Sequence, residues 1–304
     1  MTSGPIELHL GVAELTRADE LYATVLGGER LTAGEDLGRW ALPPGLVVTA
    51  EVGPRGPTGL TLATDDLDAV VAWAAHEHVA TETRDDRLVV TDDRLGGGEL
   101  TLVVARDARG DLGEGRFDDH LMAPGPSARV DAGRGTCSVH RFDHVCLAVP
   151  DLALAADLAA TMGGTPVIGG DGHQGGRVLQ FKFRTGVSLE LVTPTGPGPV
   201  RDFLDRRDGR AGVQHATLLV DDLLVALAAL EQAGFATVGT DTTTQPSWHE
   251  TYIRPRSADG MLLQLVQTSA HHPGPLTNEQ VRDVLAGHYI AHDYRMHRIE
   301  EVAP

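Results

Sequence analysis

Two stretches in the second half of the chain decide the fold: residues 142–152 read FDHVCLAVPDL and residues 213–223 read VQHATLLVDDL. Each places a histidine inside an apolar, strand-like run, and each leads through an acidic residue and a leucine into an amphipathic segment. A polar side chain in a buried strand costs free energy unless it is bonded to something. The pair therefore predicts two related strands that each hold one bonded histidine, His144 and His215.

The same order of elements follows each histidine. His144 is followed by the helical pattern DLALAADLAATMGG and then by VSLELVTP, which contains Glu190. His215 is followed by DDLLVALAALEQAGF and then by MLLQLVQ, which contains Gln264. The similar intervals indicate an internal repeat. In such a unit the first and last strands lie side by side, so alternation of side chains predicts that each histidine shares a concave face with its polar partner.

The first half of the chain repeats this order more faintly. The segments IELHLGVAELTRADELYATVLGG and GLTLATDDLDAVVAWAAHEHV both read as a strand followed by a helix. At the positions of the four polar residues, the first half has Glu7, Thr49, Gly59 and Leu102, a set that does not suit a metal ion. The sequence therefore predicts an α+β fold of four βαβββ modules in two pairs. Each pair is expected to form a curved mixed β-sheet cup, with polar convergence in the second cup.

Composition along the chain indicates its organisation. A segment rich in Gly, Arg, Asp and Pro has no hydrophobic period and is predicted to be a linker. Near the C-terminus, Thr277 and Gln280 form a capping-box pattern that predicts a C-terminal helix. The expected parts are a metal-free domain at 1–105, the linker at 106–139, a metal-binding domain at 140–270 and a helical tail at 271–304.

The tail is rich in histidine. His288 and His292 lie one turn apart in the expected helix, a spacing compatible with a metal ion. No HExxH motif accompanies them. This helix is therefore expected to pack as a lid or as a dimer element.

Charge and cysteine content limit the partners. Among the 304 residues, 43 are acidic and 25 are basic, and the net charge of −18 opposes binding to nucleic acid or to an anionic membrane. No apolar run reaches the length of a membrane helix, and the start of the chain does not read as a signal peptide. The two cysteines, Cys137 and Cys146, are too few for a disulfide framework. We expect a soluble, cytoplasmic protein with a small-molecule substrate, and a homodimer formed through exposed sheet edges.

A metal site is the function that the four polar residues favour. Any one of them alone is more often a hydrogen-bonded structural residue or a surface residue. Together they supply two imidazoles, one carboxylate and one amide oxygen, which suit one divalent transition metal such as Fe, Mn, Co, Ni or Zn. The predicted ligands are His144, Glu190, His215 and Gln264.

The second half resembles the vicinal oxygen chelate superfamily, which includes glyoxalase I, methylmalonyl-CoA epimerase and extradiol dioxygenases. The resemblance rests on FDHVCLAVPDL, on residues 189–223 and on RPRSADGMLLQLVQ at 254–267. It implies a metal ion that binds substrate through vicinal oxygens. In the epimerase, the ligand positions correspond to the same four residues, with the carboxylate and the amide exchanged.

A second branch of this superfamily has a different ligand set. Extradiol and hydroxyphenylpyruvate-type dioxygenases have a metal-free first pair of modules and an iron triad in the second. The resemblance places that triad on His144, His215 and Gln264, where Gln264 replaces the usual carboxylate. In that case Glu190 would supply the carboxylate, and iron would have one fewer open coordination position.

The acid/base residue is expected near the metal. The resemblance to the epimerase points to the region before the third strand of the module, which contains His173. The resemblance to ring-cleaving enzymes points to the region before the last strand, which contains His249 and Tyr252. These three are the catalytic candidates; further polar residues expected nearby are Lys182, Glu250 and Arg254.

Three hypotheses for function follow. The first is isomerase, epimerase or lyase chemistry through a metal-stabilised enolate. The second is an Fe(II)-dependent extradiol or hydroxyphenylpyruvate-type dioxygenase. The third is a non-catalytic protein that binds a small molecule, as in resistance proteins of the superfamily. The sequence does not specify the substrate, because substrate contacts lie in loops without a readable period.

Overall fold

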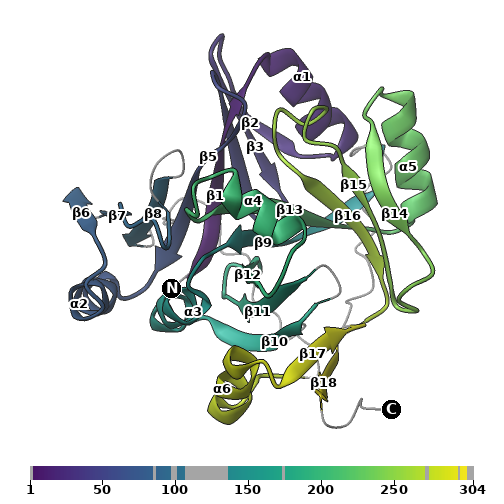
Figure 1. Ribbon diagram of the computed structural model, residues 1–304. Helices are drawn as coiled ribbons and strands as arrows, with labels where there is room; N and C mark the ends of the chain where they lie inside the picture. Colours follow the sequence, from purple (N-terminus) through teal and green to yellow (C-terminus); the bar gives the residue numbers. More distant parts are fainter. Residues whose placement is uncertain are drawn as a thin grey trace.

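The computed structural model describes residues 3–84, 87–96, 101–106, 136–172, 175–270, 274–293 and 295–299. Most of the expected linker lies outside these residues. Two mixed β-sheets with helices at their margins make up the described part (Figure 1). Among the described residues, no helix combines the length and the apolar character needed to cross a membrane.

The first sheet contains the N-terminal part of the chain. Its described strands lie in the spatial order β2 (Glu29–Ala33), β3 (Leu37–Leu42), β4 (Leu46–Val52), β1 (Gly4–Val12), β5 (Gly56–Thr64), β8 (Thr101–Arg106), β7 (Arg87–Val90) and β6 (Thr81–Arg84). Helix α1 (Leu15–Asp19) continues as a π-helical segment (Glu20–Val25), and α2 (Leu67–His76) follows β5.

The second sheet contains the predicted site. Its described strands lie in the order β14 (Thr237–Asp241), β15 (Trp248–Ile253), β16 (Leu263–Thr268), β13 (Gly212–Val220), β9 (Val139–Ala148), β12 (Ser188–Pro194), β11 (Gly176–Lys182), β10 (Thr165–Asp171), β17 (Tyr289–His292) and β18 (Arg295–Arg298). The helices of this half are α3 (Leu152–Thr161), α4 (Pro199–Asp205), α5 (Leu223–Gln232) and α6 (Asn278–Ala286).

The strand order confirms the predicted modules. In each module the first strand pairs in parallel with the last, as β9 does with β12 and β13 with β16. The two modules of a half then join through their first strands, which are antiparallel: β1 with β5, and β9 with β13. The α+β fold of paired βαβββ modules is therefore present in both halves.

Aspartates begin the helices of three modules. The side chains of Asp66, Asp151 and Asp222 each accept a hydrogen bond from a backbone N–H in the first turn of α2, α3 or α5. Such a cap satisfies a donor that the helix itself leaves unpaired. The acidic residue at the end of each first strand thus turns the chain from strand into helix.

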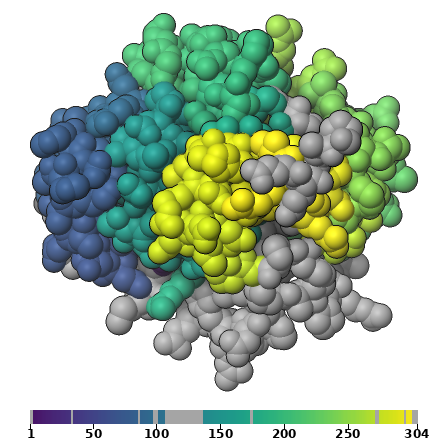
Figure 2. Space-filling view, turned by 60° about the horizontal axis from the view of Figure 1, so that its bottom comes forward, coloured from purple at the N-terminus to yellow at the C-terminus, as the bar shows by residue number. Residues whose placement is uncertain are grey.

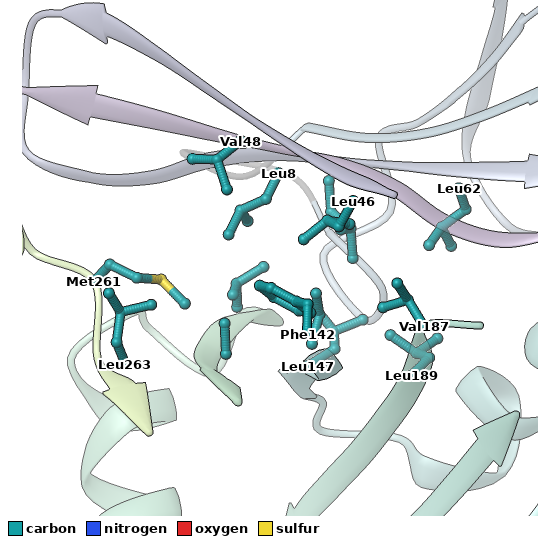
Figure 3. Close-up of a cluster of buried hydrophobic side chains, with 14 of the residues drawn as sticks. Leu8, Leu46, Val48, Leu62, Phe142, Leu147, Val187, Leu189, Met261 and Leu263 are labelled. Atoms are coloured by element: carbon teal, nitrogen blue, oxygen red, sulfur yellow. The ribbon is translucent and has the colours of Figure 1, made fainter. Parts of the chain in front are cut away.

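One hydrophobic core joins the two sheets. Leu8, Leu46 and Leu62 of the first sheet face Phe142 and Leu189 of the second, with their side chains between the sheets (Figure 3). All five are at most 3% exposed. Because side chains alternate along a strand, the opposite face of the second sheet is left to form the cup.

The C-terminal tail differs from the single helix expected. The capping box of Thr277 and Gln280 is present, but α6 ends at Ala286, where Gly287 adopts a left-handed conformation with φ 84°. The chain then forms the hairpin β17–β18, and β17 pairs with β10. The prediction that the tail histidines lie one helical turn apart was therefore wrong, because His292 ends a strand.

Since the core is shared, its disruption should affect both halves. We expect Phe142→Ala to lower the free energy of unfolding by about 3–5 kcal/mol, the usual cost of removing a buried phenyl ring. Urea unfolding followed by circular dichroism measures this change. A loss below about 1 kcal/mol would contradict the packing described here.

Candidate metal centre

The predicted ligands come from neighbouring strands of the cup. His144 lies on β9, directly across from Thr217 of β13, and Ser188 of β12 is its neighbour on the other side. Glu190 lies two residues further along β12, on the same face as Ser188. Strand order therefore brings side chains that are far apart in the sequence into one cavity.

Two β-bulges place a polar residue beside each histidine. The pairing of β13 with β9 skips Gln214 between Val213 and His215, and it skips Asp143 between the partners of Thr217 and Leu218. A bulge adds one residue to a strand and redirects its side chain. Asp143 and Gln214 are therefore held next to the rings of the histidines that follow them.

Three donor atoms converge in the cavity. His144 Nε2 lies 3.3 Å from His215 Nε2, and each of these nitrogens lies 3.9 Å from an oxygen of Glu190. All three residues can offer atoms within 4.8 Å of one another, and within the described residues this is the one such His/Cys/Asp/Glu group. These separations suit ligands that lie about 2.0–2.2 Å from a common ion.

The outer nitrogens of both rings are already bonded. His144 Nδ1 lies 2.9 Å from Asp143 Oδ2, and His215 Nδ1 contacts Gln214 Oε1. Because a carboxylate or an amide oxygen only accepts, Nδ1–H donates in both pairs. When both rings are neutral, their Nε2 lone pairs face each other, and this is the tautomer that a metal ion requires.

The pKa values of the two histidines are shifted in opposite directions. Burial, and then the neighbouring His144, hold the pKa of His215 well below its usual value, so this ring stays neutral. Burial also lowers the pKa of His144, but the charge of Glu190 and the hydrogen bond and charge of Asp143 outweigh it and raise that pKa. A cation between the rings would meet the same negative charges.

Cys146 also lines the cavity, but as a thiol. Burial, and then the nearby Glu190, raise the pKa of Cys146 well above its usual value. A metal ligand must be a thiolate. The donor atoms that converge within the described residues are nitrogen and oxygen, and Cys146 is not among them.

The fourth predicted ligand, Gln264, lies in the same cavity in a chain of hydrogen bonds. Its Oε1 accepts from Thr217 Oγ1 at 2.6 Å, and Thr217 Oγ1 lies 2.9 Å from His144 Nε2. Its Nε2 donates to Glu250 Oε2 at 2.6 Å and contacts the Tyr252 hydroxyl at 2.9 Å. The amide oxygen thus lies on the histidine side of the cavity.

Comparison with known proteins finds relatives of the second half of the chain. Residues 143–252 match the model of the glyoxalase/bleomycin resistance protein/dioxygenase superfamily. An ethylmalonyl-CoA/methylmalonyl-CoA epimerase from Cereibacter sphaeroides is 29% identical over 133 residues, which are 42% of this chain and 98% of the epimerase. Residues 143–252 thus belong with this superfamily, which is also called the vicinal oxygen chelate superfamily.

Two solved structures share the fold over nearly the whole chain. A mutant of 4-hydroxymandelate synthase from Streptomyces coelicolor matches with a TM-score of 0.57, covering 92% of this chain and 96% of that one at 18% identity. A catechol 2,3-dioxygenase matches with a TM-score of 0.55, covering 90% of each chain at 15% identity. At these identities the likeness concerns the fold.

The catalytic candidates have different positions relative to the vicinal oxygen chelate cup. Tyr252 lines the cavity, and its ring centroid lies 6.4 Å from that of His215. His249 does not line it: on β15, Trp248, Glu250 and Tyr252 face the cavity, so alternation turns His249 to the other side. His173 lies outside the described residues.

Two further polar residues are also away from the cavity lining. Lys182 is on the cup side of β11 beyond Gln180, where burial lowers its pKa. Arg254 donates through Nε to the carbonyl of Thr237 at the outer strand β14. Neither residue lines the cavity.

The cavity encloses about 160 Å³. Its lining combines apolar side chains with the polar residues of the site. Among the described residues, neither lysine nor arginine lines it. Gln180, opposite Glu190 across the β11–β12 pair, is 2% exposed, and its Nε2 has no hydrogen-bond partner there. The apolar lining residues are Ile168, Val178, Val192, Val200 and Ala291.

The C-terminal hairpin forms part of the cavity wall through Ala291, His292 and Asp293. Asp293 Oδ1 accepts hydrogen bonds from the backbone N–H and hydroxyl of Ser247, and Asp293 N–H donates to Gln245 Oε1 at 2.8 Å. These contacts join the turn between β17 and β18 to the segment before β15. In Figure 2, the yellow C-terminal segment accordingly lies between the teal and the green parts of the surface.

The corresponding positions in the first sheet are occupied differently. Thr49 Oγ1 donates to Glu7 Oε1 at 2.5 Å, and Arg39 forms an ion pair with the same oxygen at 3.1 Å. Arg39 therefore supplies the positive charge for this carboxylate. This ion pair is a structural difference between the two halves.

Sequence reasoning did not single out the residues that hold the ligands. Asp143 and Gln214 lie within FDHVCLAVPDL and VQHATLLVDDL without a periodic pattern that marks them, and nothing in the sequence points to Gln180 or Trp248. One signal was available, because a polar residue directly precedes both histidines of the repeat. The side-chain alternation around a bulge was not predictable without the register.

The bond from His144 to Asp143 provides a first test of the metal site. We expect Asp143→Asn to weaken cobalt(II) binding by about 10–100-fold, the usual effect of losing an outer partner of a ligating histidine. Asp205→Asn, on the exposed surface of α4, is the matched control and should leave affinity unchanged. Equal affinities for all three proteins in a cobalt titration would argue against the site.

Proposed function

We propose that this chain is a divalent-metal-dependent enzyme that isomerises, epimerises or cleaves a small oxygenated metabolite bound through two vicinal oxygens. The carrying observation is the convergence of His144, Glu190 and His215, with both Nδ1 atoms bonded from behind. The proposed fourth ligand is Gln264. Two imidazoles and two oxygens leave room for two substrate oxygens on a six-coordinate ion.

The bound metal would act as a Lewis acid that favours an enolate of the substrate. The protein contributes by holding the ligands in a buried cup, where electrostatic interactions are stronger than in water. Asp143 and Gln214 keep the two rings in the ligating tautomer. The apolar part of the cavity lining excludes water from the rest of the substrate.

The cavity also limits the substrate. A dry cavity of about 150 Å³ is large enough for a benzene molecule, so the volume here suits a body of roughly one ring or a short acyl chain. Because the described lining has no lysine or arginine, this end of the substrate is best uncharged. Gln180 Nε2 is a donor for a substrate oxygen, since rotation about its broad terminal torsion can turn it into the cavity.

Tyr252 is the proposed proton-transfer residue. Its hydroxyl lies in the cavity, 2.9 Å from the amide nitrogen of Gln264 and 3.4 Å from Glu250 Oε1. A group within reach of a metal-bound substrate is suited to donate or accept a proton at the reacting carbon. Of the three catalytic candidates, the geometry supports this one.

The relatives support isomerisation more than oxygen chemistry. The curated protein similar in sequence is named an epimerase, and its similarity extends over its own length. The exchange of carboxylate and amide, with Glu190 on β12 and Gln264 on β16, keeps the charge and the number of oxygen donors. A homodimer remains a prediction from the exposed sheet edges.

An Fe(II)-dependent dioxygenase is the second candidate, because two histidines and one carboxylate are the ligand set of many non-haem iron oxygenases. The 4-hydroxymandelate synthase and catechol 2,3-dioxygenase folds agree with this plan. A third candidate is a protein that binds a small molecule without catalysis. The hydrogen bonds that hold both histidines in the ligating tautomer argue against it, because such binding does not require a metal ligand.

Isotope exchange and oxygen uptake separate these candidates. We expect cobalt-loaded protein in D2O to exchange the acidic C–H of a small 2-hydroxy ketone or acyl thioester, seen as loss of its proton NMR signal, without oxygen uptake. His215→Ala should abolish the exchange. Oxygen uptake by anaerobically iron-loaded protein with catechols or 2-oxo acids would instead support the dioxygenase and contradict the isomerase.

Tyr252→Phe tests the proton-transfer role. Removing the hydroxyl should lower the exchange rate by about 100-fold, within the usual contribution of a general acid or base. Metal affinity should stay within about twofold, because the phenyl ring is retained and Glu250 keeps its shorter hydrogen bonds to Trp248 and Gln264. An exchange rate equal to that of the wild type would remove Tyr252 from the mechanism.

A further inference from the structure

We infer that Glu250 is a positioning residue that holds the amide of Gln264 with its oxygen directed to the metal centre. The inference rests on the proposed function, because it concerns how the fourth ligand is oriented. Glu250 would thus supply, through an amide, the negative charge that a carboxylate on β16 would supply directly. Its position on β15, directly beside Gln264's strand, makes this contact possible.

The hydrogen bonds define which end of the amide faces which neighbour. A carboxylate only accepts, so the 2.6 Å contact between Glu250 Oε2 and the side chain of Gln264 identifies that end as the NH2 group. The other end accepts from Thr217 Oγ1 at 2.6 Å, and this hydroxyl lies beside His144 Nε2. With Glu250 present, a flip of the amide would place two oxygens against each other.

Glu250 is itself firmly held. Trp248 Nε1 donates to its Oε2 at 2.7 Å, and the Tyr252 hydroxyl donates to its Oε1 at 3.4 Å. Glu250 is 6% exposed and Gln264 is 4% exposed, so both ends of the contact are buried. Each of these donors fixes the carboxylate in the plane where it meets the amide.

The charge of Glu250 also lacks a basic partner. Within the part of the chain that the structure describes, neither lysine nor arginine forms an ion pair with it. A buried carboxylate without a cation is costly, although hydrogen bonds offset part of the cost. A divalent ion on the far side of Gln264 would offset more of it, because the polarised amide transmits the charge. Glu190 and Glu250 therefore both favour a cation in the cup.

A double-mutant cycle tests this role. Cobalt(II) affinity is measured for the wild type, Glu250→Gln, Gln264→Glu and the variant with both substitutions. In the wild-type background, Glu250→Gln should weaken binding about tenfold, because the amide loses the partner that fixes its orientation. In the Gln264→Glu background, the same substitution should strengthen binding, because it removes a carboxylate facing another and restores a donor.

The decisive result is that Glu250→Gln weakens cobalt(II) binding in the wild-type background and strengthens it in the Gln264→Glu background. If Glu250 acted only through its charge on the ion, its loss would weaken binding in both backgrounds, and the inference would be overturned. Unfolding midpoints of the metal-free proteins show whether a change merely reflects misfolding. Glu231→Gln, on the exposed face of α5, is the control and should leave cobalt affinity unchanged.

The cycle also distinguishes this inference from the proposed function. If His215→Ala left wild-type cobalt binding unchanged, the metal site and the proposed function would both fail. If cobalt bound through His215 but Glu250→Gln had equal effects in both backgrounds, only the positioning role would fail.

Discussion

The site depends on one costly arrangement: two imidazole nitrogens 3.3 Å apart beside a carboxylate, inside a protein. Burying such groups costs free energy unless each has a partner. Asp143 and Gln214 satisfy the outer nitrogens, and this leaves the inner lone pairs facing one another. A metal ion between the rings would satisfy both lone pairs, so the proposal of a metal site rests on the hydrogen bonds behind the rings.

The sheet is what makes the arrangement possible. Pairing of β9 with β12 and of β13 with β16 brings the four predicted ligand positions onto one curved surface, while the opposite face packs against the first sheet through residues such as Phe142 (Figure 3). A rigid shared core fixes strand positions to the accuracy that ligands require. The C-terminal hairpin, joined through Asp293 to the segment before β15, then limits the size of the cavity.

Much of this could be predicted from the sequence, because the repeat fixes which strands are neighbours and which side chains share a face. The module order and the convergence of His144, Glu190 and His215 both follow from that periodicity. The features that the sequence did not reveal depend on local backbone geometry. The bulges at Asp143 and Gln214 have no period to reveal them. His249 faces away from the cavity because it alternates with the cavity-lining residues of β15, and the tail leaves the helix at Gly287.

The most direct measurement of the central claim is a crystal structure of the protein soaked with manganese(II), with anomalous diffraction data. The account predicts one strong anomalous peak within about 2.0–2.3 Å of His144 Nε2, His215 Nε2 and a Glu190 oxygen, distances usual for transition-metal ligands. A cup without a peak at saturating manganese, or with a peak bound to other residues, would contradict it.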